Sequence, residues 1–367
     1  MIPEFKSSPI YSIGVEVEFQ LVDQNSLALA PRAPEILQAL SRKQGAYIKK
    51  EFIQSMLEVT TGICANMAEV ERDLMGTTRY LEEKAKKADV LLHSTSLHPF
   101  SRASEQRLTD DPRYREILED LKIVGQRLIT QGLHVHIGVP DGDTAIKVVD
   151  HMRSYLPLIL TLTASSPFFE GVDTGLHSFR TKLLEALPRS GIPAELRTWK
   201  EFVGLATTLM ELGVISDIRD IWWDVRPHPY FGTVEVRIAD VPPRMKEILA
   251  VAALIHTLVV HIADTRRPRL FPHRLIIANN KWQAARYAMD GAFVDMEHKR
   301  RITQKDAIKT LLATLEKRFF VLGNEKYLDT LMEILELGPG SLRQRLLREK
   351  GYTFEQIIRQ NIQGFWE

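Results

Sequence analysis

The stretch Gly14-Val15-Glu16-Val17-Glu18-Phe19 places two glutamates two positions apart in an otherwise apolar run. Alternation from Ser12 to Val22 predicts a β-strand, in which side chains two positions apart point to the same face. Two carboxylates held this close need a cation between them or a proton on one of them. The pattern therefore indicates a metal site. The simpler alternative is an edge strand whose two glutamates face water.

Two later strands carry polar pairs with the same spacing. Two histidines share a face in Gly132-Leu133-His134-Val135-His136-Ile137-Gly138, and a glutamate and an arginine do so in Thr233-Val234-Glu235-Val236-Arg237-Ile238. Each pair alone also fits a structural role, as half-buried histidines or as a salt-bridged face. One shared polar cavity explains all three strands, and its carboxylates and imidazoles suit Mg²⁺ or Mn²⁺.

The composition excludes several classes of protein. The chain has 367 residues, 44% of them hydrophobic and 26% charged, with a net charge of +1 and no long basic run, so no nucleic-acid partner is expected. The single cysteine, Cys64, and the lack of a signal-peptide pattern predict a cytoplasmic protein. The apolar stretch from Ile248 to Ala263, about 16 residues, is shorter than the roughly 20 that span a bilayer. We expect a buried helix and no membrane association.

The order of elements favours one α+β domain over 1–367, with a core over about 10–290 and a helical part over about 291–367. A strand over 51–60 and helices over 67–88 and 145–163 are predicted within the core. From about Asn280 the pattern is helical to the end. Amphipathic segments lie near 303–322, 325–337, 341–349 and 353–362, separated by glycine-containing breaks.

Two common nucleotide-binding motifs, G-x-x-x-x-G-K-[ST] and G-x-G-x-x-G after a strand, do not occur in the sequence. Phosphate would then be held by metal ions on carboxylates and by arginines such as Arg180, Arg226 and Arg237.

These motifs, in this order, resemble the glutamate–cysteine ligase superfamily on the glutamine synthetase-like fold, and within it the carboxylate-amine ligases of the YbdK type. The resemblance also rests on the segments 51–58 and 280–287, and it covers about residues 10–290. It implies a curved antiparallel sheet that forms a funnel with surrounding helices. ATP would enter from one side and the amino-acid substrate from the other.

The resemblance implies a role for each candidate residue. The metal ligands would be Glu16, Glu18, Glu51, Glu58, His134 and Glu235, with Glu58 also catalytic. Arg237 would be catalytic and contact the transferred phosphate of ATP, Arg180 would bind phosphate or carboxylate, and His136 and Arg226 would bind substrate. Because Glu51 and Glu58 lie seven residues apart, a regular strand would point them to opposite faces, and a bulge or loop is needed. The segment 222–228 is expected to form a loop beside the site, and 165–180 a substrate-binding or lid loop.

The implied reaction phosphorylates a carboxylate with ATP and joins the acyl phosphate to an amine, with glutamate as the expected acid and cysteine or another amine as its partner. A homodimer is expected from the family. Two alternatives stay open: a metal-dependent amide hydrolase in which His134 and His136 hold the ion that activates water, and a non-catalytic binding protein with a degenerate ligase site.

Overall fold

The structure is a computed structural model that describes residues 4–265 and 272–367. Its centre, within those residues, is a seven-stranded antiparallel sheet with the order β10-β11-β5-β1-β3-β2, and β4 pairs with the end of β1. The strands are β1 Ile13–Asp23, β2 Ile48–Lys50, β3 Met56–Thr60, β4 Val90–His93, β5 Leu133–Gly138, β10 Val225–His228 and β11 Thr233–Val236. The predicted α+β class and antiparallel sheet are confirmed.

The register of this sheet places the candidate site residues opposite one another. Directly opposed pairs are Glu16 with His134, Glu18 with Glu58, His136 with Glu235, and Arg226 with Glu235. The alternate residues of β1, among them Val15, Val17 and Phe19, are fully buried in the main hydrophobic core. One face of β1 therefore packs into the protein and the other collects the polar side chains.

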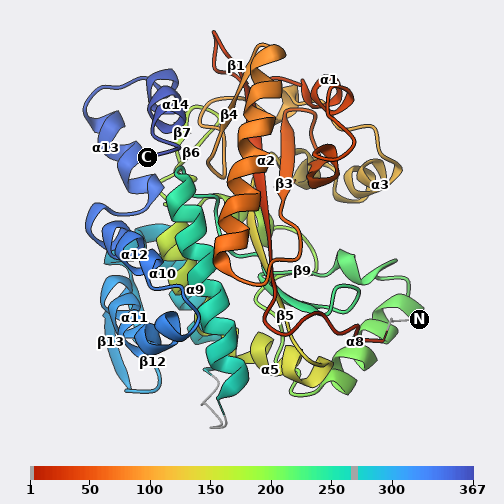
Figure 1. Ribbon diagram of the computed structural model, residues 1–367, viewed down its shortest axis with the longest axis vertical. Coiled ribbons are helices and arrows are strands. Elements are labelled where there is room, and N and C mark those ends of the chain that lie inside the picture. The colour runs from red at the N-terminus through yellow and green to blue at the C-terminus, as the bar shows by residue number, and fades with distance from the viewer. Residues whose placement is uncertain (1–3, 266–271) are drawn as a thin grey trace.

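Two long helices, α2 Met67–Lys87 and α9 Met245–Asp264, lie side by side and contact β1 and β5 (Figure 1). Helix α9 has 20 residues, more than the predicted apolar stretch, and is long and apolar enough to cross a membrane. However, 83% of its apolar window is buried inside the protein, so it is a core helix as expected. Burial, rather than length, decides the assignment.

The C-terminal part contains the four helices that the sequence predicts. They are α11 Gln304–Val321, α12 Lys326–Leu337, α13 Gly340–Glu349 and α14 Phe354–Gln363, stacked along one side of the molecule (Figure 1). Thr303 and Thr353 cap two of them by accepting backbone N–H bonds from Asp306 and Gln356. The apolar faces of α11 and α12 join the same core as β1, whereas Ile358 of α14 packs in a smaller cluster with Val22 and Leu27.

Three boundaries predicted from sequence are wrong. The strand expected over 51–60 begins only at Met56, because 51–55 form a turn after β2. The helix expected over 145–163 is two helices, α5 Gly142–Met152 and α6 Leu156–Thr163, and Pro157, which lacks an N–H, sits in the first turn of α6. The region after Asn280 is not helical throughout, since β12 Ala292–Asp295 and β13 Arg300–Thr303 form a hairpin.

The loop expected over 222–228 is also wrong, since β9 Trp222–Trp223 and β10 occupy it. The expected lid segment holds the short hairpin of β6 Phe168–Phe169 and β7 Val172–Asp173 and ends at α7. The remaining elements are α1 Ala33–Gln38, α3 Pro112–Leu121, α4 Ile123–Gln126, α7 Arg180–Glu185, β8 Ser190–Gly191, α8 Trp199–Glu211, α10 Arg274–Tyr287, and single 3₁₀ turns at 45–47, 103–105, 218–220 and 288–290.

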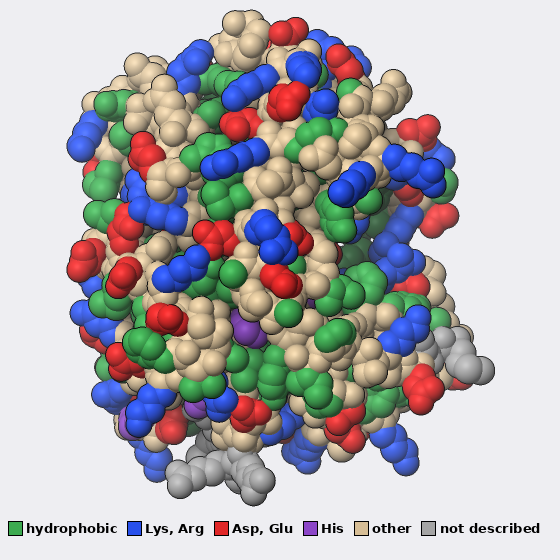
Figure 2. Space-filling model, viewed as in Figure 1, with side chains coloured by type: hydrophobic (Ala, Val, Ile, Leu, Met, Phe, Trp, Pro, Cys, Tyr) green, Lys and Arg blue, Asp and Glu red, His purple; other side chains and the backbone are tan. Residues whose placement is uncertain are grey.

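On the face seen in Figure 2, basic and acidic side chains alternate without a broad patch of one sign, and the surface is hollowed at the right-hand edge between α3 and α8. This mixed surface agrees with the near-neutral net charge.

Candidate active site

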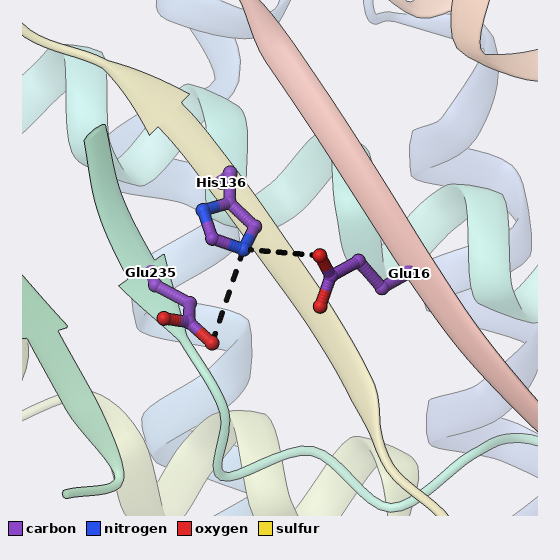
Figure 3. A group of neighbouring side chains, drawn as sticks. All are labelled: Glu16, His136 and Glu235. Carbon is purple, nitrogen blue, oxygen red and sulfur yellow. Dashed lines mark ion pairs between the residues drawn. The ribbon is translucent and has the colours of Figure 1, made fainter. Parts of the chain in front are cut away.

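The polar face of the sheet gathers the predicted carboxylates and histidines into one cluster. Among the described residues, three groups of possible metal ligands have donor atoms within 4.8 Å of one another. These groups are Glu16, His136 and Glu235; Glu16, Glu58 and His134; and Glu18, Glu51 and Glu58. Figure 3 shows the first group, in which side chains from β1, β5 and β11 point toward one another. Glu16 and Glu58 each belong to two groups, so the groups adjoin.

Glu51 reaches this cluster because it does not lie on a strand. It follows the last residue of β2 and precedes the turn that leads into β3. The seven-residue separation from Glu58 therefore places no constraint on its direction, and both carboxylates join the group with Glu18. A loop position resolves the conflict that a regular strand would create.

The carboxylates at the β3 side of the cluster favour protonation. Burial raises the pKa of Glu18 to about 7 and that of Glu58 to about 8, with neighbouring carboxylates adding to both increases. Burial and the charges of Glu18 and Glu58 also raise the pKa of Glu51 well above its usual value. Burial and mutual repulsion disfavour negative charge on all three carboxylates at once. A divalent cation bound between them would stabilise their charged forms.

At the β11 side the negative charge is already balanced. Burial would raise the pKa of Glu235, but Arg226 and Arg237 lower it well below the usual value. Likewise, the neighbouring histidines outweigh the burial of Glu16 and lower its pKa. Burial and the charge of Arg237 lower the pKa of His134 to about 4, so its imidazole is neutral and suited to bind a metal.

His136 differs from His134 in its partners. Burial would lower its pKa, but the carboxylates of Glu235 and Glu16 raise it. Its Nδ1 lies 3.0 Å from the hydroxyl of Thr233, and its Nε2 lies 3.6 Å from Glu16 and 3.8 Å from Glu235. The structure thus places His136 among possible metal ligands, whereas the sequence predicted a substrate contact; the substrate role stays a prediction.

The three candidate arginines have different surroundings. Arg226 is buried, with Nε 2.6 Å from Glu235 and Nη1 donating to the carbonyls of Arg219 and Ile221. Arg180 is buried and donates to the carbonyls of Arg237 and Ile238, both at 3.3 Å. Because both guanidinium groups are bonded to protein atoms, Arg180 and Arg226 fit a role in positioning other parts of the site. Their predicted contacts with phosphate, carboxylate or substrate stay predictions.

Arg237 contacts Glu235 and lies 3.5 Å from Nδ1 of His134. Its side chain is 23% exposed, more than those of Arg180 and Arg226, so its guanidinium borders the open part of the site. This position suits the predicted contact with a transferred phosphate.

Sequence reasoning missed several residues of the site. Lys49 lies 3.2 Å from Glu58, but no strand was predicted at β2 and no pattern pointed to it. The hydroxyl of Thr233 contacts His136, and its position two before Glu235 was a usable signal. Asp240 is fully buried and accepts hydrogen bonds from Ser165, Ser166 and Ser178, which fixes the segment that carries Arg180.

The donor atoms of the three groups fit the divalent metal that the family resemblance implies. The groups offer mainly carboxylate oxygens with an imidazole nitrogen, and no thiolate takes part. Such ligands suit Mg²⁺ or Mn²⁺ rather than a structural zinc ion.

The antiparallel sheet and its surrounding helices form a fold shared with solved ligases. The glutamate–cysteine ligase of Francisella tularensis, solved in complex with AMP, has a TM-score of 0.71 at 15% identity, covering 98% of this chain and 90% of that one. A bifunctional glutathione synthetase from Pasteurella multocida has a TM-score of 0.72 at 16% identity, covering 97% of this chain and 52% of that one.

Sequence comparison then gives the family. The profile of glutamate-cysteine ligase family 2 matches residues 12–365, and the chain belongs to that family. A relative from Gloeobacter violaceus is 37% identical over 360 residues, 96% of each chain, and one from Bdellovibrio bacteriovorus is 36% identical over 358 residues, 96% of this chain and 94% of its own. Both carry the provisional name glutamate–cysteine ligase 2. The protein is an ATP-dependent carboxylate-amine ligase, which confirms the predicted family and enzyme class.

Proposed function

We propose that the protein phosphorylates glutamate with ATP and joins the resulting acyl phosphate to an amine, with Mg²⁺ or Mn²⁺ held by the carboxylate cluster. The observation that carries this proposal is the set of three adjoining ligand groups on one sheet face, bordered by Arg237. The names of the relatives support glutamate and cysteine as substrates, and the AMP in the Francisella enzyme supports an adenine nucleotide.

The metal ligands would be Glu16, Glu18, Glu51, Glu58, His134 and Glu235, joined by His136. Bound there, Mg²⁺ or Mn²⁺ would neutralise the charge of the phosphates. Arg237 would contact the phosphoryl group as it moves, and Glu235 would hold Arg237 and Arg226 in place through their ion pairs. The chain's own contribution is mainly positioning and charge neutralisation.

In the first step a substrate carboxylate oxygen attacks the terminal phosphorus of ATP, and the bond to ADP breaks. In the second step an amine attacks the acyl carbon and phosphate leaves. A cytoplasmic homodimer with small-molecule substrates is part of the same proposal, and size-exclusion chromatography with light scattering tests the dimer.

The experiment that tests the activity uses the purified protein with ATP, Mg²⁺ and glutamate, followed by separate additions of cysteine and other amines. Phosphate release and amide formation that both depend on acid and amine support the proposal. Cleavage of an amide with metal alone and without ATP would instead support the hydrolase. Absence of both ATP binding and metal binding would support the degenerate binding protein.

A further inference from the structure

A cavity lies outside the three ligand groups. Its volume is about 590 Å³, and its walls come from α7, β8 and α10 together with the residues next to them. The lining residues that bear on its chemistry are Lys182, Glu185, Arg274, Leu275, Lys281 and Trp282.

The floor of this cavity is a buried lysine. The side chain of Lys281 is only 2% exposed, and its ammonium lies 2.6 Å from Asp224 and 3.1 Å from Glu185. Lys182 also pairs with Glu185, at 2.7 Å. Arg274 is a third cation in the lining, and among the described residues it has no ion pair with a carboxylate. A ligand that carries an anionic group would balance its charge.

Two contacts connect the cavity to the phosphate-transfer centre. The carboxylate of Asp224 binds Lys281, while its backbone carbonyl accepts the N–H groups of Arg237 at 2.8 Å and Ile238 at 3.1 Å. Helix α7 makes the second connection, because it starts at Arg180 beside Arg237 and ends at Glu185 in the cavity wall. Its length from first to last residue is about 7.5 Å at 1.5 Å per residue. Asp224 and α7 therefore link the lining of the cavity to Arg237 and Arg180.

Apolar side chains line the cavity beside the charged ones. Trp282 is 45% exposed and Leu275 71% exposed, although both are large hydrophobic side chains. Exposed aromatic and aliphatic surface beside a few charged groups is the usual composition of a small-molecule pocket, and the volume lies within the range for such pockets of roughly 300–1,000 Å³.

We propose that this cavity binds the amine substrate, and that this amine carries a carboxylate and an apolar or aromatic group larger than the side chain of cysteine. The carboxylate pairs with Arg274, since Lys281 is already paired with Asp224 and Glu185, and the apolar group packs on Trp282 and Leu275. The inference rests on the proposed function and names the substrate class of the same reaction.

The amine arrives as an ammonium ion and reacts with the acyl phosphate. The nitrogen forms a bond to the acyl carbon, and the carbon–oxygen bond to phosphate breaks with its electron pair on phosphate. Of the three ammonium protons, one stays on the amide, one ends on the phosphate and one is released to water. No oxidant or further reactant is needed.

The test compares two nucleophiles in the same enzyme. Hydroxylamine is small and uncharged, so it traps the acyl phosphate as a hydroxamate without needing the cavity, whereas phenylalanine must bind there to form an amide. In wild-type enzyme we expect kcat/KM for phenylalanine to exceed that for phenethylamine, its carboxylate-free analogue, by about tenfold or more, the size of one lost charged hydrogen bond. We expect it to exceed that for cysteine by about tenfold, because the larger apolar side chain buries more surface in the cavity. A preference for cysteine or phenethylamine would overturn the inference.

Two variants locate the binding site. Arg274→Ala and Trp282→Ala should lower the ratio of amide to hydroxamate about tenfold through a higher KM for phenylalanine. Arg286→Ala on the same helix, outside the cavity, is the matched control and should leave the ratio unchanged. A fall of hydroxamate in step with amide would contradict a role confined to the amine.

If wild-type enzyme forms no hydroxamate, the proposed function fails, and the cavity is then judged by calorimetry with phenylalanine alone. Binding that Arg274→Ala weakens about tenfold would support the cavity as a carboxylate site. Equal binding by both proteins, or none by either, would refute it.

Discussion

The geometry around Gly132 makes a sharp prediction, because a single added methyl group would disturb two site residues at once. The N–H of Gly132 donates to Glu18 at 2.6 Å. A Cβ at this position would lie 2.5 Å from Nη2 of Arg180 and 2.8 Å from Nε2 of His134. Since nonbonded heavy atoms prefer about 3.5 Å or more, each buried group would have to move by roughly 1 Å.

For Gly132→Ala we expect a loss of about 100-fold in kcat, the usual size for a displacement of about 1 Å at a reaction centre. Overpacking should lower the free energy of unfolding by about 1–3 kcal/mol and leave the protein folded. The assay is ADP release coupled to NADH oxidation, with circular dichroism as the check on folding.

The matched control is Gly14→Ala on the neighbouring strand, where the added Cβ would lie 3.5 Å from Cβ of His136, an ordinary contact. This variant should keep kcat within about twofold, since it displaces nothing. Normal turnover and normal metal affinity in Gly132→Ala would refute the arrangement of Arg180 and His134 described above.

Three other predictions follow from the same site. Glu16→Gln, which alters two ligand groups, should lower Mg²⁺-dependent ATP turnover about 100-fold with the fold retained, and wild-type turnover would overturn the metal assignment. Arg237→Lys should lower kcat by about 10²–10³ at similar KM for glutamate, because a point charge does not replace a planar fork; an unchanged kcat would contradict the phosphate contact. The third concerns pH: since folding raises the pKa of Glu18 to about 7 and of Glu58 to about 8, from 4.5, the folded state binds extra protons. Without Mg²⁺ the free energy of unfolding should then fall as pH rises from about 4.5 toward 8, and the Mg²⁺-induced increase in Tm should be larger at pH 8.5 than at pH 6; equal increases would count against this site.

The sequence predicts the central strands well because alternation reports directly on a sheet with one buried face. Strands β1 and β5 and helix α2 lie within one or two residues of their predicted bounds. The predictions fail where long-range pairing sets the structure. Strand β2 has three residues and exists because it pairs with β3. The hairpin of β12 and β13 has no glycine or proline in its own turn, 296–299, although Asp290-Gly291 before β12 was a usable signal.

In the candidate site, too, local patterns predict some features and long-range pairing decides the others. Side-chain spacing within a strand placed Glu16 with Glu18 and His134 with His136, but pairing between strands decides which residues meet. Register puts Glu16 opposite His134, which no local pattern contains. The salt bridge from Arg226 to Glu235 likewise depends on β10, which the sequence suggested as a loop.

The central claim is that the carboxylate becomes an acyl phosphate before the amine reacts. Glutamate labelled with ¹⁸O in its side-chain carboxylate tests this, with the released phosphate analysed by mass spectrometry. Transfer of one ¹⁸O atom from the carboxylate to each phosphate, dependent on Mg²⁺ and amine, is the predicted result. Phosphate without ¹⁸O, at the same rate of ATP cleavage, would contradict it.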